Sequence, residues 1–307
     1  MPKLALKVDV DTLRGTREGV PRLIDILNRH RIKATFLFSL GPDHTGRAIK
    51  RVFRKGFLGK LARTSVLKHY GLKTLLYGTL LPGPDIGRGE AELMRSVRDQ
   101  GFEVGIHCWD HIAWQDNVSR MPRPWTLRQM QQAVDRFTSI FGVAPMTHGA
   151  AGWQMNNHAF ELENQFGFVY CADTRGTHPF LPVSAEGTPL GPPQLPGTLP
   201  TFDELIGLNG ITGKTAHLAL LENTRSNRRE AQLFTLHAEL EGMKLAGAFE
   251  QLIIGWQSQG YELVSCLDLF RSLPQPLPAH TIAYGEIDGR SGPCCLQGAP
   301  VLTYHDT

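Results

Sequence analysis

Acidic and histidine side chains that could bind a metal ion occur where three predicted strands end. In GIHCWDHIAW, His107 and His111 lie four positions apart, one helical turn, and at this separation both rings can reach one ion. In KVDVDT, Asp9 and Asp11 lie on the same side of a strand, because side chains alternate between its two faces. In FTLHAELEG, His237 ends a later strand. These segments together predict one site.

One carboxylate and two imidazoles suit a divalent cation such as zinc, with cobalt, manganese or nickel as alternatives, and leave positions open for water and substrate. A metal-bound water can have its pKa lowered to about 7. The second aspartate could then take the water proton as general base, and His237 could protonate the leaving group. This set of residues predicts hydrolysis of an amide.

Each motif on its own also has a more ordinary explanation. Two histidines at this spacing are more often surface or hydrogen-bonded core residues, and an aspartate at a strand end is often a turn or cap residue. His237 alone is more often structural. The appearance of all three motifs at strand ends, in this order, is far more specific than any one of them.

Strand and helix patterns alternate along the chain and predict how these residues are positioned. Strand patterns occupy residues 3–10, 33–40, 102–107, 168–173 and 231–240, and residues 261–270 close the series. Helical patterns lie between them, at residues 19–32, 89–101, 127–142, 158–167 and 245–260. Such alternation predicts a mainly parallel α/β sheet or barrel, in which polar groups at the carboxyl ends of strands mark the active site.

Three segments interrupt this pattern. The proline-rich residues 178–201 are expected to form a long connection, with at most a short edge strand. Residues 44–84 are expected to form a basic amphipathic insertion in a barrel domain of residues 1–273. The tail, residues 274–307, is rich in turn residues and is expected to be poorly ordered. The five cysteines include no CxxC pair and are interpreted as reduced and structural.

The insertion has an unusual charge distribution. Between Thr45 and Pro84 there are nine Lys and Arg residues and no acidic residue, so the rest of the chain carries 3 − 9 = −6 of the formal net charge of +3. Apolar residues recur there at helical spacing with basic residues beside them, which is typical of an interfacial helix on anionic lipid. The residues predicted to contact the membrane are Ile49, Lys50, Arg51, Phe53, Arg54, Lys55 and Phe57.

A solvated face and a nucleic-acid site are the alternatives for this helix. The apolar side is too continuous for a helix that follows phosphates, and the rest of the chain is acidic, so nucleic acid is not expected as a partner. The chain shows neither an export signal at its start nor an apolar run long enough to span a bilayer. We therefore expect a peripheral protein on the cytoplasmic side of the inner membrane.

DVD, HCWDH and LHAELEG resemble the aspartate, HxxxH and LxH motifs of the polysaccharide deacetylase family, also called carbohydrate esterase family four. The resemblance extends from Lys3 to about Phe270. It implies a distorted (β/α) barrel and a metal-dependent de-N-acylase. It also implies a role for each motif residue: Asp9 as base, His237 as acid, and Asp11, His107 and His111 as metal ligands.

The chain departs from the family in the third motif, which usually contains an arginine. That motif would fall near THGAAGW, where Gly149 stands in the arginine's place. Another group must then orient the base, and Arg175 is one candidate. Trp109, His148, Trp153, Asp173 and Arg175 are also expected to contact substrate, and Asp173 resembles the acidic residue of the fourth motif.

Longer segments, such as GIHCWDHIAWQD and CADTRGTHPF, are similar to one branch of the family. The resemblance implies removal of a formyl group from an aminosugar carried on a polyprenyl phosphate. The basic segment predicts that this takes place at an anionic inner-membrane surface. De-N-acetylation of another glycan is also compatible with the motifs. Less specific alternatives are a DxD glycosyltransferase, a non-haem iron oxygenase and a catalytically silent lipid-binding module.

Overall fold

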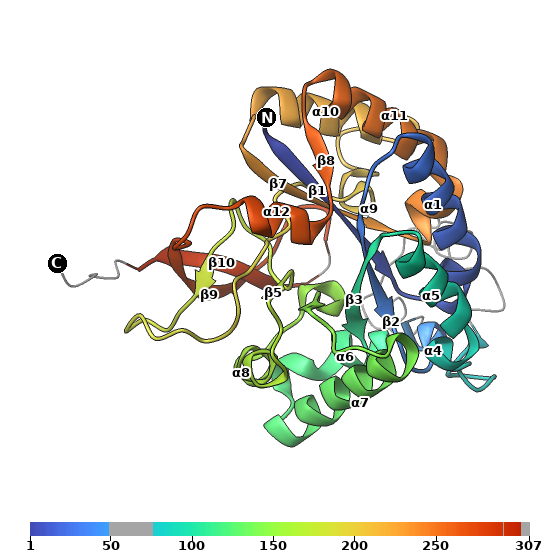
Figure 1. The fold of residues 1–307 in the computed structure, drawn as a ribbon, viewed down its shortest axis with the longest axis vertical. Coiled ribbons are helices and arrows are strands. Elements are labelled where there is room, and N and C mark those ends of the chain that lie inside the picture. The colour runs from blue at the N-terminus through green and yellow to red at the C-terminus, as the bar shows by residue number, and fades with distance from the viewer. Residues whose placement is uncertain (49–75, 291, 302–307) are drawn as a thin grey trace.

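The computed structural model describes residues 1–48, 76–290 and 292–301 (Figure 1). It shows an α/β fold in which a curled parallel sheet forms half of a barrel, in agreement with the predicted fold class. The seven residues predicted to contact the membrane lie within 49–75, outside the described residues. The helical insertion, and with it that part of the prediction, therefore remains an expectation.

The main sheet has seven parallel strands. Six follow the order β5-β4-β3-β2-β1-β7, and β8 pairs with the first half of β1. The strands are β1 (Lys3–Val10), β2 (Thr35–Ser39), β3 (Glu103–Cys108), β4 (Thr147–His148), β5 (Tyr170–Cys171), β7 (Ala231–His237) and β8 (Glu262–Val264). Because all of these strands run in the same direction, their carboxyl ends lie at the same edge of the sheet.

Helices cover the outer face of the curled sheet, as Figure 1 shows for α1, α5, α7 and α11. The α-helices of the described residues are α1 (Val20–Arg29), α4 (Ile86–Gly89), α5 (Ala91–Asp99), α6 (His111–Asn117), α7 (Arg123–Phe141), α8 (Asn157–Phe166), α9 (Phe202–Leu205), α10 (Ala216–Ser226), α11 (Ala246–Ser258) and α12 (Cys266–Ser272). Shorter turns of 3-10 or π type are η1 (Gly15–Gly19), η2 (Thr45–Ala48), η4 (Val118–Arg120), η5 (Ala151–Trp153) and η6 (Leu240–Lys244).

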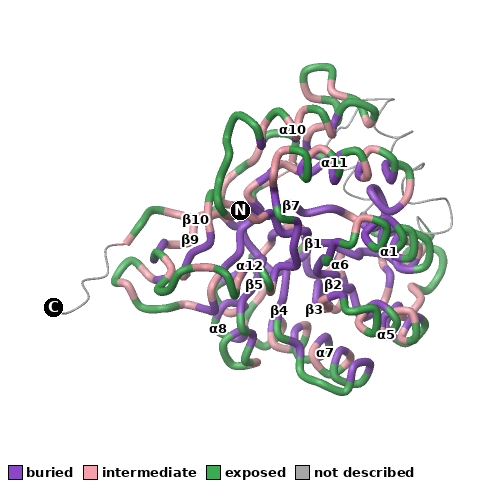
Figure 2. The backbone as a smooth tube through the Cα atoms, turned by 45° about the horizontal axis from the view of Figure 1, so that its top comes forward, coloured by how far each residue is buried: buried purple, intermediate pink, exposed green. Residues whose placement is uncertain are grey.

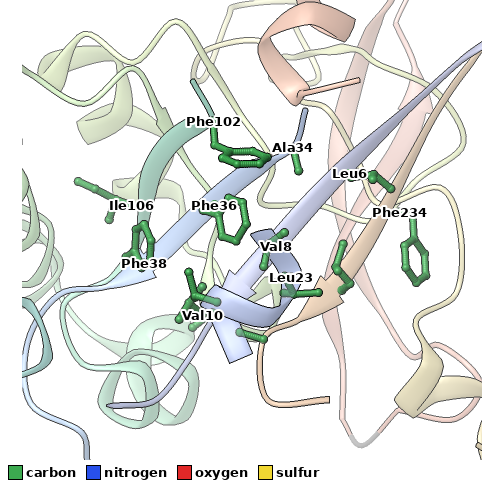
Figure 3. Close-up of a cluster of buried hydrophobic side chains, with 14 of the residues drawn as sticks. Leu6, Val8, Val10, Leu23, Ala34, Phe36, Phe38, Phe102, Ile106 and Phe234 are labelled. Atoms are coloured by element: carbon green, nitrogen blue, oxygen red, sulfur yellow. The ribbon is translucent and has the colours of Figure 1, made fainter. Parts of the chain in front are cut away.

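The central strand β1 separates two environments. Its even-numbered residues, among them Leu6, Val8 and Val10, pack with Leu23 and Phe36 in the hydrophobic layer beneath the helices (Figure 3). Its odd-numbered residues must therefore point to the opposite face, the interior of the half-barrel. The strands of the main sheet are mostly buried, and most of the exposed residues lie in the surrounding helices and loops (Figure 2).

Local sequence signals explain where several helices begin and end. The side chain of Asn156 caps α8 by accepting a hydrogen bond from the backbone of Ala159, at 2.9 Å. Gly142 and Gly167 end α7 and α8 with φ of 74° and 75°, a left-handed conformation that glycine adopts without strain. These signals agree with the helices predicted from periodicity.

The expectation of a poorly ordered tail is wrong for residues 279–285 and 294–300. There β9 (Ala279–Gly285) and β10 (Cys294–Pro300) form an antiparallel pair, and β9 also pairs in parallel with β6 (Leu181–Pro182) of the proline-rich connection. Cys294 and Cys295 are fully buried. The strand β6 is two residues long and lies about one hundred residues before its partner β9, so local periodicity could not identify that pair.

Candidate active site

Three strands bring the predicted site residues to the same edge of the sheet. Asp9 of β1 is the direct register partner of His237 of β7. His107 lies near the end of β3, one strand beyond β2. Asp9, His107 and His237 occupy alternating positions whose side chains face the interior of the half-barrel. Parallel pairing of the strands therefore places Asp9 beside His237, although the two residues are 228 positions apart in the sequence.

Asp11, His107 and His111 form a group that could hold a cation, as predicted. Their ligand atoms all lie within 4.8 Å of one another. Oδ1 of Asp11 is 3.2 Å from Nε2 of His107, and Oδ2 is 3.4 Å from Nε2 of His111. Oδ1 of Asp11 is buried and makes no hydrogen bond, so a cation would satisfy it. The residues present therefore fit a divalent metal ion.

One detail of the prediction is wrong, because the two histidines do not lie on one helical turn. His107 belongs to β3, and His111 is the first residue of α6. Asp110 caps α6 by accepting from the backbone of Ala113 at 3.0 Å, and its other oxygen accepts from His44 at 2.6 Å. The strand-to-helix turn thus places the centres of the two rings 5.3 Å apart, a distance that spacing alone does not specify.

The backbone around the group fixes which atoms face the cation position. Nδ1 of His107 donates to the carbonyl oxygen of Gly149 at 2.6 Å, which leaves Nε2 as the atom directed at Asp11. Oε1 of Glu239 accepts from the backbone of Asp11 and Thr12, at 3.1 and 2.9 Å. Burial, together with the charge of Asp11, raises the pKa of Glu239 to about 8.

The electrostatics of the group favour an ionised Asp11. Burial by itself raises the pKa of Asp11, but the positive charges of His111, His107 and His237 outweigh burial and hold the pKa well below its usual value. The low pKa favours the carboxylate form of Asp11, which is the form that binds a cation.

His237 is placed to carry a proton. Its Nδ1 is 3.8 Å from Oδ1 of Asp203, and its backbone N donates to Glu241 at 2.8 Å. Burial lowers the pKa of His237, but the surrounding carboxylates, with Asp203 the largest contributor, raise it to about 9. Burial also raises the pKa of Glu241 to about 7. The imidazolium form of His237, which a general acid requires, is thus favoured at neutral pH.

His148 and Asp173 lie in a closed network rather than on an accessible surface. Nδ1 of His148 is 2.8 Å from Oδ1 of Asp173 and 3.0 Å from Oε1 of Glu163, and all three residues are buried. Burial lowers the pKa of His148, but Asp173 and Glu163 raise it to about 10. Asp173 also accepts from the backbone of Ala150 at 2.7 Å. Contact with substrate, predicted from sequence, does not fit this burial, and the network supports the loop after β4.

The remaining residues predicted to contact substrate differ in accessibility. Trp109 is partly exposed and lies beside the metal-ligand turn, whereas Trp153 is 2% exposed. Arg175 is also buried, and its guanidinium binds Glu204 at 2.5 Å and the carbonyl oxygens of Gly197 and Leu199 at 3.0 Å. Trp109 is therefore the member of this set that keeps an accessible face.

A family model for polysaccharide deacetylases matches residues 3–171, more than half of the chain. The chain belongs to the polysaccharide deacetylase family. It is thus a hydrolase that acts on an amide, and its three-residue group agrees with the general metal dependence of family members.

Two relatives in this family match almost the whole chain. Both carry the name "Probable 4-deoxy-4-formamido-L-arabinose-phosphoundecaprenol deformylase ArnD". The protein from Shewanella sediminis is 37% identical over 290 residues, which cover 94% of this chain and 93% of the relative. The protein from Wigglesworthia glossinidia brevipalpis is 33% identical over 281 residues, covering 91% and 96%.

Solved structures of more distant proteins share the deacetylase fold. A "putative polysaccharide deacetylase" from Mycobacterium smegmatis has a TM-score of 0.62 at 17% identity, with 93% of this chain and 96% of that chain covered. Puue allantoinase has a TM-score of 0.60 at 15% identity, with 88% and 89% covered. These similarities support the fold and carry no argument about substrate.

Sequence reasoning missed several residues that complete the site. They are Lys7, His44, Asp110, Asp203, Glu239 and Glu241. Lys7 could have been recognised, because it precedes Asp9 by two positions and so shares its side of the strand. Asp203, in the short helix α9, and His44, in the loop before η2, gave no such signal, because their approach to the site depends on the tertiary fold.

Proposed function

We propose that this protein removes the formyl group from 4-deoxy-4-formamido-L-arabinose linked to undecaprenyl phosphate. Two relatives with this activity in their names match over nine tenths of the chain, and the predicted base, acid and cation-binding group are all present at one edge of the sheet. The observation that carries the proposal is the clustering of Asp11, His107 and His111 within reach of one ion. In this role the protein would act in the lipid A modification that confers polymyxin resistance.

The chain's own side chains have distinct tasks in this reaction. A cation held by Asp11, His107 and His111, zinc or another divalent ion, would polarise the formamide and activate water. Asp9 accepts the water proton through Oδ1, which is buried, makes no hydrogen bond and lies 3.8 Å from His107. His237, protonated at neutral pH, donates a proton to the departing amine of the sugar.

Exposed apolar residues support a lipid-linked substrate. At the start of the described chain after residue 75, Leu76, Leu80 and Leu81 expose 37%, 81% and 39% of their surface. These leucines lie in the last part of the acid-free segment, after its final basic residue, Lys73. A surface of this composition fits contact with anionic lipid on the cytoplasmic leaflet. None of the helices in the described parts of the chain is long and apolar enough to cross a bilayer.

The proposal is tested by incubating the metal-loaded protein with the formylated lipid-linked sugar and measuring formate and the mass of the lipid product. We expect release of formate and a free amine. Chelator and Asp9→Asn should each abolish most of the activity. The acetylated analogue is the matched comparison: hydrolysis of the acetamide without hydrolysis of the formamide would favour a de-N-acetylase of another glycan and contradict the deformylase proposal.

Membrane contact is tested separately by liposome flotation. We expect binding to vesicles that contain anionic lipid at physiological salt, and weaker binding to neutral vesicles. Replacing Leu80 and Leu81 by serine should reduce the bound fraction, whereas Val143→Ser, at an exposed valine elsewhere on the surface, should not. Equal binding of all three proteins, or none to anionic vesicles, would contradict this part of the proposal.

A further inference from the structure

Lys7 is an unusual residue for the middle of a central strand. It lies in β1 between β2 and β7, and its exposed fraction is 0%. A buried ammonium group is unfavourable unless a charged partner compensates for the loss of hydration. That partner is Asp9, whose Oδ2 accepts from Nζ of Lys7 at 2.8 Å. The two side chains share the inner face of the strand because they are two positions apart.

The loop after β4 passes close to this ammonium group. A Cβ atom on Gly149 would lie 3.5 Å from Nζ of Lys7 and 2.4 Å from a methyl group of Leu37. The Trp153 ring lies on another side, with its centre 5.2 Å from Nζ, a distance that permits a cation–π interaction. The glycine that stands in place of the family's arginine is therefore adjacent to Lys7.

The other candidate for orienting the base is already engaged. Arg175 binds Glu204 and two backbone carbonyl oxygens, and no contact with Asp9 is found among the described residues. Lys7 donates a hydrogen bond to Oδ2 of Asp9 only. Oδ1 of Asp9 is buried, makes no hydrogen bond and lies 3.8 Å from Nδ1 of His107. One oxygen is thus anchored, and the other is left for a proton.

We propose that Lys7 is the positioning residue of the base. It supplies from β1 the positive charge that the third motif usually supplies from a loop, and it fixes Asp9 so that Oδ1 faces the substrate water. This inference rests on the proposed function, because it assigns Lys7 a task in that hydrolysis. Gly149 itself is kept small by Leu37, because a Cβ atom there would lie 2.4 Å from a methyl group of that residue.

The test compares Lys7→Met, Lys7→Arg, Asp9→Asn and the double variant Lys7→Met/Asp9→Asn with the wild type, each loaded with metal. We expect Lys7→Met to lower kcat by about 10–100-fold with KM within about threefold, as for other residues that orient a reacting group. Lys7→Arg, which keeps the charge, should recover most of the loss. Metal content should remain unchanged in all variants. Lys3→Met is the matched control, because Lys3 lies on the same strand but pairs with Glu262 at 4.0 Å, away from the site.

The double variant separates a positioning role from a structural one. If Lys7 acts through Asp9, its removal should not lower kcat further once Asp9→Asn has removed the base. The double variant leaves no unpaired buried charge, so it should fold even if Lys7→Met does not. A kcat for the double variant more than about threefold below that of Asp9→Asn, or a folded Lys7→Met with wild-type kcat, would overturn the inference. A wild type that releases no formate would instead contradict the proposed function.

Discussion

The role of Asp11 as a metal ligand, distinct from that of Asp9, can be tested without a substrate. Asn is nearly isosteric with Asp but lacks the negative charge that a cation needs. Asp11→Asn should therefore remove the stabilisation that a divalent ion gives to the folded protein. Asp9→Asn should keep it, because Asp9 lies outside the group whose ligand atoms fall within 4.8 Å of one another.

The size of the effect follows from linkage. At a free metal concentration one hundred times the dissociation constant, binding stabilises the folded state by about 2.7 kcal/mol. Unfolding 307 residues with about 2.1 cal/mol/K of entropy each gives about 0.64 kcal/mol/K. Dividing the stabilisation by this entropy predicts that the melting temperature rises by about 4 °C. At a free metal concentration one thousand times the dissociation constant, the predicted rise is about 6 °C.

Differential scanning fluorimetry with added zinc, cobalt or manganese is a suitable assay. Each variant is compared with itself in chelator, so that any effect of the substitution on the metal-free protein cancels. We expect a shift of about 4–6 °C for the wild type and for Asp9→Asn, and less than about 1 °C for Asp11→Asn. A full shift in Asp11→Asn, or its loss in Asp9→Asn, would refute the assignment of ligand and base.

Three further predictions follow from the structure. The reaction rate should fall above about pH 9, because the pKa of His237 is raised to about 9 and its protonated form is the acid; a bound cation would shift this fall to lower pH. Asp203→Asn should also shift the fall in rate to lower pH. A pH–rate profile that Asp203→Asn leaves unchanged would contradict the pairing of Asp203 with His237. Deletion of the residues after Pro274 should lower the melting temperature seen by circular dichroism, because β9 and β10 pair with β6; an unchanged melting temperature would show that they are dispensable. The pKa of His148 is raised from 6.5 to about 10, so protonation of His148 contributes fully to stability below pH 6.5, and this contribution is lost as the pH rises through 10. The midpoint of urea unfolding should therefore fall between pH 6.5 and 10, and it should fall less in His148→Gln than in the wild type.

The sequence determined the parts of this protein that depend on local periodicity. Alternation in KVDVDT predicted that Asp9, in β1, and Asp11, directly after it, share one side of the strand, and helical spacing identified α1, α7 and α11. Polar residues at three strand ends predicted a cation site, and the family resemblance assigned Asp11, His107 and His111 to it, a group that the structure brings within 4.8 Å. The strand and helix patterns and the motifs are each carried by neighbouring residues, so they can be recognised without knowledge of the fold.

The tertiary structure decided which distant groups meet. Asp203 reaches His237 from α9, and Glu239 bonds the backbone of Asp11 across 228 positions. Local sequence patterns do not show that His148 and Asp173 are buried away from the accessible surface. They also do not show that Lys7 is buried with Asp9 as its charged partner. Two charges that are unremarkable in a sequence become a defined pair only when packing excludes water from both, because the loss of hydration makes any other arrangement unfavourable.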